Sequence, residues 1–210
     1  MRLDEIFEYS NKALESEDLA REEALILARE AIQLSSYSIR AIHRGEEENA
    51  ENLLEKARRV LLKAQERLAP HPKIYYSGFL QDAEKEVAEA SITISLILNK
   101  PLPSPTEMSI GIAPYLNGLG EAVGEMRRHV LDLIRIDNLD RAESILETMD
   151  EIYFILNSLD YPSAITGNLK RTNDMVRGVI ERTRGDLTSA ISRKSLEKSL
   201  EQFLKTITES

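Results

Sequence analysis

The amino-acid sequence predicts an all-α protein, a single-domain bundle of about seven helices, and three observations support this. Apolar residues recur every three or four positions in each long segment, which is the spacing of a helix with one buried face. No segment alternates polar and apolar residues for long enough to indicate a strand. The nine glycines and seven prolines fall mostly between the periodic segments, where helices are expected to end. Because the composition does not shift abruptly, we expect one domain over residues 1–210.

The first half of the chain predicts three long helices. The first covers residues 3–44 and ends at Gly45, a residue type that commonly follows a helix. The second covers residues 47–68 and ends before Pro70, because proline cannot continue a helix. The third covers residues 74–98 and ends at a connection that contains three prolines.

The second half begins with a short helical turn around residues 106–109, followed by a fourth long helix over residues 114–135. Three further helices are predicted over residues 139–159, 164–184 and 187–204. Pro162 separates the first two of these and Gly185 the last two, and Asp186 is placed to cap the final helix.

The composition excludes several kinds of site. The chain has no cysteine, which excludes disulfides and thiolate metal sites, and its three scattered histidines cannot form a structural zinc site alone. The N-terminal segment lacks a signal-peptide core, and the most apolar run, SITISLIL, is too short to cross a bilayer. We therefore expect a cytoplasmic protein with no membrane partner.

The net charge of −9 argues against a surface coated with phosphate-binding groups. Residues 168–198 nevertheless hold eight Lys and Arg residues against four acids, which is a hint of an anionic partner. The alternative is that these cations lie on solvated helix faces.

Carboxylates on the third predicted helix lie between two apolar surfaces. When each residue advances about 100° around the axis, a polar seam separates a broad apolar face from a smaller one. This seam consists of Asp82, Glu86, Glu89 and Thr93. Because burying an unpaired carboxylate costs several kcal/mol, these acids are expected to have compensating partners.

The fourth predicted helix contains the stretch GEAVGEMRR, residues 120–128, in which two more acids, Glu121 and Glu125, face away from the apolar side. Three glycines, Gly118, Gly120 and Gly124, stand in the same helix, although each costs about 1 kcal/mol relative to alanine. Their missing side chains would allow another helix or a ligand to approach closely.

If the two helices are neighbours, Glu86, Glu89, Glu121 and Glu125 could converge. Four carboxylates form an all-oxygen set suited to Mg²⁺ or Mn²⁺, ions that polarise phosphoryl oxygens and activate water. The alternative is that the glutamates form ordinary solvated faces. A ferritin-like di-iron site is excluded, because the chain has no Glu-x-x-His motif.

The stretch PYLNGLGEAVGEMRR, residues 114–128, resembles a segment close to DYLLGVADLTGELMR in TRAX (translin-associated factor X) members of the translin/TRAX family. The residues shared in register are Tyr115, Leu116, Gly118, Gly124, Glu125 and Arg128, and Met126 lies one position before the methionine of that segment. Upstream, Tyr75 and Tyr76 are similar to the paired tyrosines of translin, and KEVAEA, residues 85–90, is similar to QEYVEA of TRAX. The order of the predicted helices also fits most of the chain.

The resemblance implies an all-α subunit of a hollow homo-oligomer, roughly an octamer, that binds RNA or single-stranded DNA. In the TRAX branch it implies a Mg²⁺-dependent endoribonuclease that cleaves RNA inside the oligomer. The metal-binding and catalytic acids of that branch fall on Glu86, Glu89, Glu121 and Glu125, with Glu121 in place of an aspartate. Translin lacks this upstream acid pair, so the presence of Glu86 and Glu89 in this chain favours the catalytic branch. Arg127 and Arg128 are the expected RNA-binding residues.

Two other functions stay open. The chain could be a translin-like module that holds single strands without cutting them, through Arg128 and the basic residues 168–198. It could also be an all-α nucleoside-triphosphate pyrophosphohydrolase, although the Glu121 and Glu125 spacing differs from the usual second motif of those enzymes.

Aromatic residues and one histidine near these motifs have simpler interpretations. Tyr75, Tyr76 and Phe79 could stack on bases, but their helical spacing favours a core position. His129 is interpreted as a surface residue.

Overall fold

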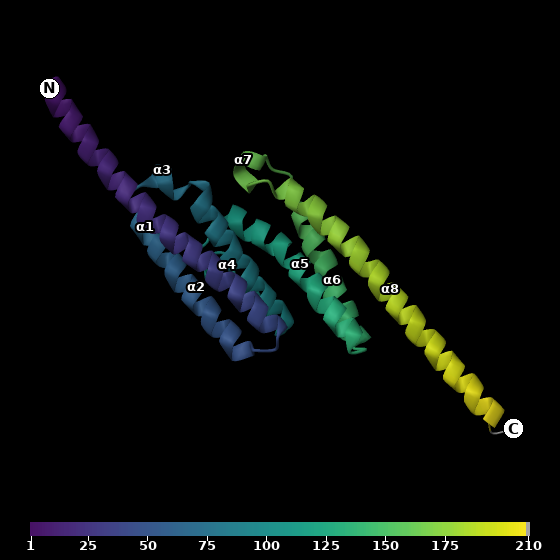
Figure 1. Cartoon of the computed structure of the whole chain (residues 1–210). Helices are drawn as coiled ribbons and strands as arrows, with labels where there is room; N and C mark the ends of the chain where they lie inside the picture. The colour runs from purple at the N-terminus through teal and green to yellow at the C-terminus, as the bar shows by residue number, and fades with distance from the viewer. Residues whose placement is uncertain (209–210) are drawn as a thin grey trace. The chain divides into compact units, whose positions relative to one another are not determined.

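The computed structural model describes residues 1–208, which form helices and no strand, so the predicted all-α class is confirmed (Figure 1). The helices are α1 (Leu3–His43), α2 (Glu47–Leu68), α3 (Pro72–Tyr75), α4 (Gly78–Ile97), α5 (Ile112–Arg135), α6 (Leu139–Asn157), α7 (Ser163–Thr166) and α8 (Leu169–Thr208). None of them, within the described residues, is both long and apolar enough to cross a membrane.

The described chain groups into two compact units. The first comprises Met1–Leu119 and Ile165–Gly167, and the second comprises Gly120–Ala164 and residues 168–208. Helix α5 begins in the first unit and continues without a break into the second. The expected single domain over the whole chain stays a prediction.

In the first unit, α1 packs along α2 and α4, and α2 also packs on α4 (Figure 1). Small residues line these contacts: Ala24 and Ala31 of α1 and Ala57 of α2 have no exposed surface. Side chains this small let two helix backbones approach closely. The turn between α1 and α2 contains Gly45 at φ +75°, a conformation that glycine adopts without strain, so the predicted helix end is confirmed.

The third predicted helix is divided in the structure. Helix α3 ends at Tyr75, and α4 begins at Gly78 after the extended residue Ser77. Beyond α4, the predicted short turn is present as a hydrogen-bonded turn, in which the Ile110 N–H donates to the Pro105 carbonyl oxygen at 3.0 Å.

In the second unit, α6 packs on α8. The predicted helix break at Gly185 is wrong, because α8 runs through this residue to Thr208. A glycine inside a helix costs only about 1 kcal/mol, and buried contacts of Thr183 and Leu187 on either side favour continuation. The real interruption lies earlier, where Gly167 and Asn168 both have positive φ.

Both ends of the described chain are exposed helical segments. The N-terminal arm, residues 3–19 of α1, has no buried residue before Ala20. The C-terminal arm, residues 191–208 of α8, is exposed at every position after Ala190. Each arm is a helix whose apolar side chains have no cover within the described chain.

Candidate metal centre

Helix α4 holds the predicted acids Glu86 and Glu89 one turn apart. Both are half-buried, because the fully buried residues Val87, Ala88 and Ala90 flank them. Lys85 precedes Glu86 on the same helix, and its Nζ lies 3.8 Å from a carboxylate oxygen of Glu86. The two carboxylates therefore stand at the edge of the core, where water screens charge less than at an open surface.

Gly118 brings the first part of α5 against α4. A Cβ at this position would lie 2.7 Å from the Lys85 carbonyl oxygen, 2.8 Å from the Ala88 Cβ and 3.0 Å from the Glu89 backbone nitrogen. These neighbours are a Cβ and backbone atoms, which cannot rotate away. Only glycine fits here, so the prediction that glycine permits close helix approach is confirmed at Gly118.

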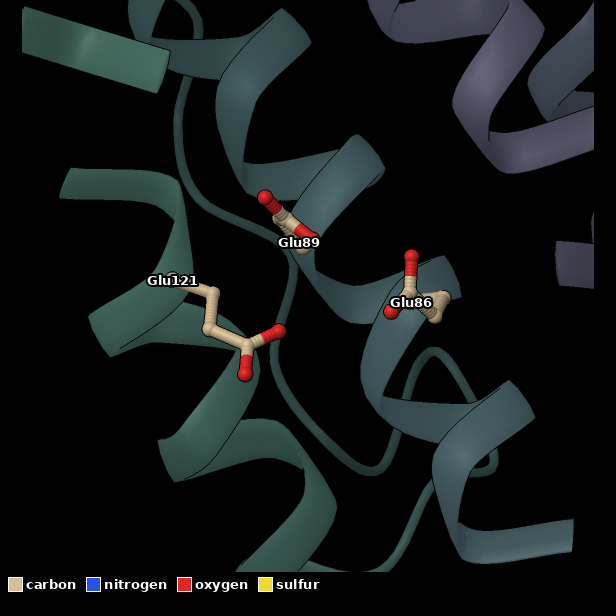
Figure 2. Close-up of side chains that lie close together, drawn as sticks. All are labelled: Glu86, Glu89 and Glu121. Atoms are coloured by element: carbon tan, nitrogen blue, oxygen red, sulfur yellow. The ribbon is translucent and has the colours of Figure 1, made fainter. Parts of the chain in front are cut away.

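The close approach places Glu121 beside the two acids of α4. Glu121 stands one turn after Gly118, two residues beyond the part of α5 that belongs to the first unit, and the helix is unbroken there. One oxygen from each of Glu86, Glu89 and Glu121 lies within 4.8 Å of the other two. Figure 2 shows Glu121 reaching from α5 toward the α4 side chains. We call these three residues the carboxylate triad.

Glu125, the fourth predicted acid, lies one turn further along α5 and is half-buried. It does not belong to the group whose oxygens meet within 4.8 Å. The structure therefore brings together three of the four predicted ligands.

The carboxylate triad has the chemistry of a divalent cation site. Two like charges about 5 Å apart repel by about 3 kcal/mol at an effective dielectric constant of about 20, and a cation would remove this cost. Oxygens at about 2.1 Å from Mg²⁺ lie about 3 to 4 Å from one another, so a small inward movement would complete the contacts. Three oxygen ligands without nitrogen or sulfur favour a hard ion such as Mg²⁺ or Mn²⁺.

A buried polar network positions the segment that leads into α5. Gln65 Nε2 donates to Glu84 Oε1 and to the Ser109 carbonyl oxygen, both at 2.8 Å. Burial raises the pKa of the Glu84 carboxyl, and hydrogen bonds from Gln65 and the Gly111 backbone oppose this. The sequence contained a signal for this residue, because Glu84 falls at helical spacing between the apolar residues Leu80 and Val87.

The two arginines predicted to bind RNA differ in their contacts. In the second unit, the half-buried Arg127 donates to Thr183 Oγ1 at 3.1 Å and pairs with Asp186 at 2.7 Å. Asp186 thus lies inside α8, where it pairs with Arg127 of α5 and does not cap a helix, which corrects that prediction. Arg128 is exposed. An RNA contact by either arginine stays a prediction.

The aromatic residues near α3 also differ from one another. Tyr75 and Phe79 are half-buried, but Tyr76 is 71% exposed, so its predicted core position is wrong. The Tyr75 and Tyr76 rings meet edge to face with centroids 5.1 Å apart. The helix break after Tyr75 explains the exposure of Tyr76, because the helical spacing no longer applies there. His129 is half-buried and not freely exposed.

Comparisons with known proteins identify the family. No protein-family profile matches the chain. Protein MJ0175 of Methanocaldococcus jannaschii is 31% identical over 192 residues, which cover 90% of this chain and 84% of that protein. AfC3PO bound to duplex RNA superimposes with a TM-score of 0.83 and 34% identity, and AfC3PO alone with 0.81 and 33%; each match covers 89% of this chain and 97% of the other.

A third solved structure supports the fold. Apo-NeC3PO superimposes with a TM-score of 0.80 at 19% identity, covering 90% of this chain and 99% of that one. Identity at this level shows the fold alone, whereas the AfC3PO matches also show relationship. The chain therefore belongs to the translin/TRAX family, together with the C3PO proteins.

Proposed function

We propose that the protein is a divalent-cation-dependent endoribonuclease of the TRAX-like branch. The observation that carries this proposal is the convergence of Glu86, Glu89 and Glu121 on a point where α5 lies against α4. Glu125, one turn beyond Glu121, would act with them. Mg²⁺ or Mn²⁺ bound there supplies polarisation of a scissile phosphate and activation of water.

The side chains of the chain itself would bind and orient the reactants. The carboxylate triad would hold the ion at the edge of the core, and the tight packing at Gly118 fixes the spacing between its two helices. Arg128, exposed further along α5, would contact a phosphate of the RNA. AfC3PO has been solved with duplex RNA, which supports RNA as the ligand class of this chain also.

Cleavage of labelled RNA tests the proposal. The full-length protein should cleave RNA with Mg²⁺ or Mn²⁺ and lose the activity with EDTA. Glu89→Gln should reduce the rate at least about a hundredfold, because the neutral amide weakens metal binding. Asp82→Asn is the matched control, since Asp82 lies exposed on the same helix. Cleavage that persists in EDTA and in Glu89→Gln would overturn the proposal.

The alternative is a non-catalytic module that binds single-stranded RNA or DNA. The exposed Arg128 of α5 favours it, but two cations of α8 in the basic segment are already paired: Arg184 with Asp150 and Lys194 with Asp137, both at 2.6 Å. Protein that binds RNA with salt-dependent affinity yet never cleaves it under any divalent ion would support this alternative.

We also propose that the protein is a homo-oligomer of about eight subunits, assembled through its two arms. The N-terminal arm exposes Leu3, Ile6, Phe7, Tyr9 and Leu14, and of these Leu3, Ile6 and Tyr9 lie on the helix face that is buried from Ala20 onward. The C-terminal arm exposes Leu196, Leu200, Phe203 and Ile207 at spacings of four, three and four residues, a continuous stripe.

The two arms complement each other in length and charge. At 1.5 Å per residue each is about 26 Å long. The N-terminal arm, residues 3–19, carries six acids and one lysine, whereas the C-terminal arm, residues 191–208, carries four Lys and Arg residues and two glutamates. These features support a contact between the N-terminal arm of one copy and the C-terminal arm of the next, a repeating arrangement that can close into a ring.

A further inference from the structure

A cavity of about 580 Å³ lies within the first unit, lined by α2, the second half of α4 and the connection after α4. Its volume is in the range of small-molecule sites, about 300 to 1,000 Å³. Ser91 lines it, and at about 100° per residue Ser91 lies on nearly the opposite side of α4 from Glu89. The cavity is therefore separate from the carboxylate triad.

Arg58 is a half-buried cation in the wall of this cavity. Its Nη2 donates to Ser91 Oγ at 3.1 Å, and the Ser91 hydroxyl donates in turn to the Val87 carbonyl oxygen at 2.7 Å. The Arg58 Nε is buried and has no hydrogen-bond partner among the described residues. Such an unsatisfied donor is costly, and a ligand oxygen would relieve it after a small rotation of the side chain.

The other charged groups of the lining are already paired. Lys100 pairs with Glu51, and Glu55 pairs with Arg59 at 3.3 Å. Burial lowers the pKa of Arg58, and the charge of Glu55 partly opposes this effect. Of the two cations in the lining, Lys100 thus has an acidic partner, whereas Arg58 forms no ion pair among the described residues.

We propose that this cavity binds a small organic anion through the guanidinium of Arg58. Nε and an Nη of arginine form a planar fork that matches two oxygens of a phosphate or a carboxylate. The apolar side chains of Leu54 and Ile94, with Pro101 and Pro103, line the space for the organic part of the ligand. This site is independent of RNA cleavage.

Calorimetric titration of the full-length protein tests the site, with adenosine monophosphate, inorganic phosphate and succinate as probes. At least one probe should bind the wild type. Arg58→Met should weaken that binding at least tenfold, whereas Lys63→Met, which removes an exposed cation from the same helix, should leave it unchanged. If only adenosine monophosphate or inorganic phosphate binds, the natural anion is assigned as a phosphate. If only succinate binds, it is assigned as a carboxylate.

Two further variants keep the test decisive if Arg58→Met fails to fold. Arg58→Lys keeps the charge but loses the fork, and should also bind at least tenfold more weakly. Glu55→Gln removes a negative charge that repels the anion from the lining, so this variant should bind the probe more tightly than the wild type. The proposal would be overturned if the Arg58 variants bound the probe as tightly as the wild type, or if Glu55→Gln bound it more weakly. It would also be overturned if the wild type bound none of the probes.

Discussion

At the scale of single residues, Gly118 decides whether α4 and α5 can lie close enough for their acids to meet. A Cβ there would come within 3.0 Å of two backbone atoms and within that distance of Ala88 Cβ, so any larger residue must push the helices apart. Gly124, two turns later in the same helix, would meet nothing within 4 Å. The two glycines thus have different roles although the sequence presents them alike.

Gly118→Ala should lower the free energy of unfolding by about 1–3 kcal/mol, because overpacking shifts the backbone. It should also abolish the increase in melting temperature that Mn²⁺ gives the wild type. Gly124→Ala is the matched control and should raise stability by about 0.5–1 kcal/mol without affecting the Mn²⁺ response. Chemical denaturation and thermal melting measure both. An unaltered Mn²⁺ response in Gly118→Ala would count against the close-packing argument.

At the scale of helices, neighbouring arginines of α5 have separate tasks. Arg127 joins α5 to α8 within the second unit through Thr183 and Asp186. Arg128 points elsewhere and is exposed. Because consecutive residues lie about 100° apart on a helix, one can pack while the other is available to a ligand.

Arg127→Met should therefore lower the free energy of unfolding by about 1–2 kcal/mol, since it removes the hydrogen bond to the buried Thr183 and the ion pair with the exposed Asp186. Arg128→Met should change stability by less than about 0.5 kcal/mol but weaken RNA binding, with the salt dependence reduced by about one counterion. Denaturation curves and filter binding at several salt concentrations measure these effects. RNA affinity that falls in Arg127→Met and not in Arg128→Met would reverse the assignment.

Sequence patterns predicted the helical class and most helix positions, because apolar periodicity reports directly on packing. The spacing of the acids allowed Glu86 and Glu89 to meet Glu121 only if their two helices are neighbours, and the resemblance to TRAX implied this grouping. The predicted break at Gly185 failed because a local propensity of about 1 kcal/mol cannot outweigh buried contacts along α8. The separation of Glu125 from the triad depends on how α5 passes α4, which spacing along one helix does not determine.

At the scale of the whole molecule, the exposed arms favour assembly with other copies. Leu14 is 65% exposed and Leu200 52% exposed, and both lie in longer apolar stripes. Contiguous apolar surface on this scale usually marks an interface. The opposite charges of the arms favour pairing between different arms.

Leu200→Asp should dissociate the oligomer, because it places a charge in the apolar stripe of the C-terminal arm. Gln202→Asp adds the same charge on the polar side of that arm and should not. Light scattering should give about eight times the 23.8 kDa chain mass for the wild type and the control, and less for Leu200→Asp. A wild-type mass equal to one chain would refute assembly through the arms.

The central claim is that the carboxylate triad binds a divalent cation, and anomalous diffraction from crystals of the full-length protein soaked in Mn²⁺ tests it most directly. We predict an anomalous peak within about 2.5 Å of carboxylate oxygens from Glu86, Glu89 and Glu121, absent from crystals of Glu89→Gln. A wild-type map with no peak at these residues, or with their carboxylates turned away from one another, would contradict the claim.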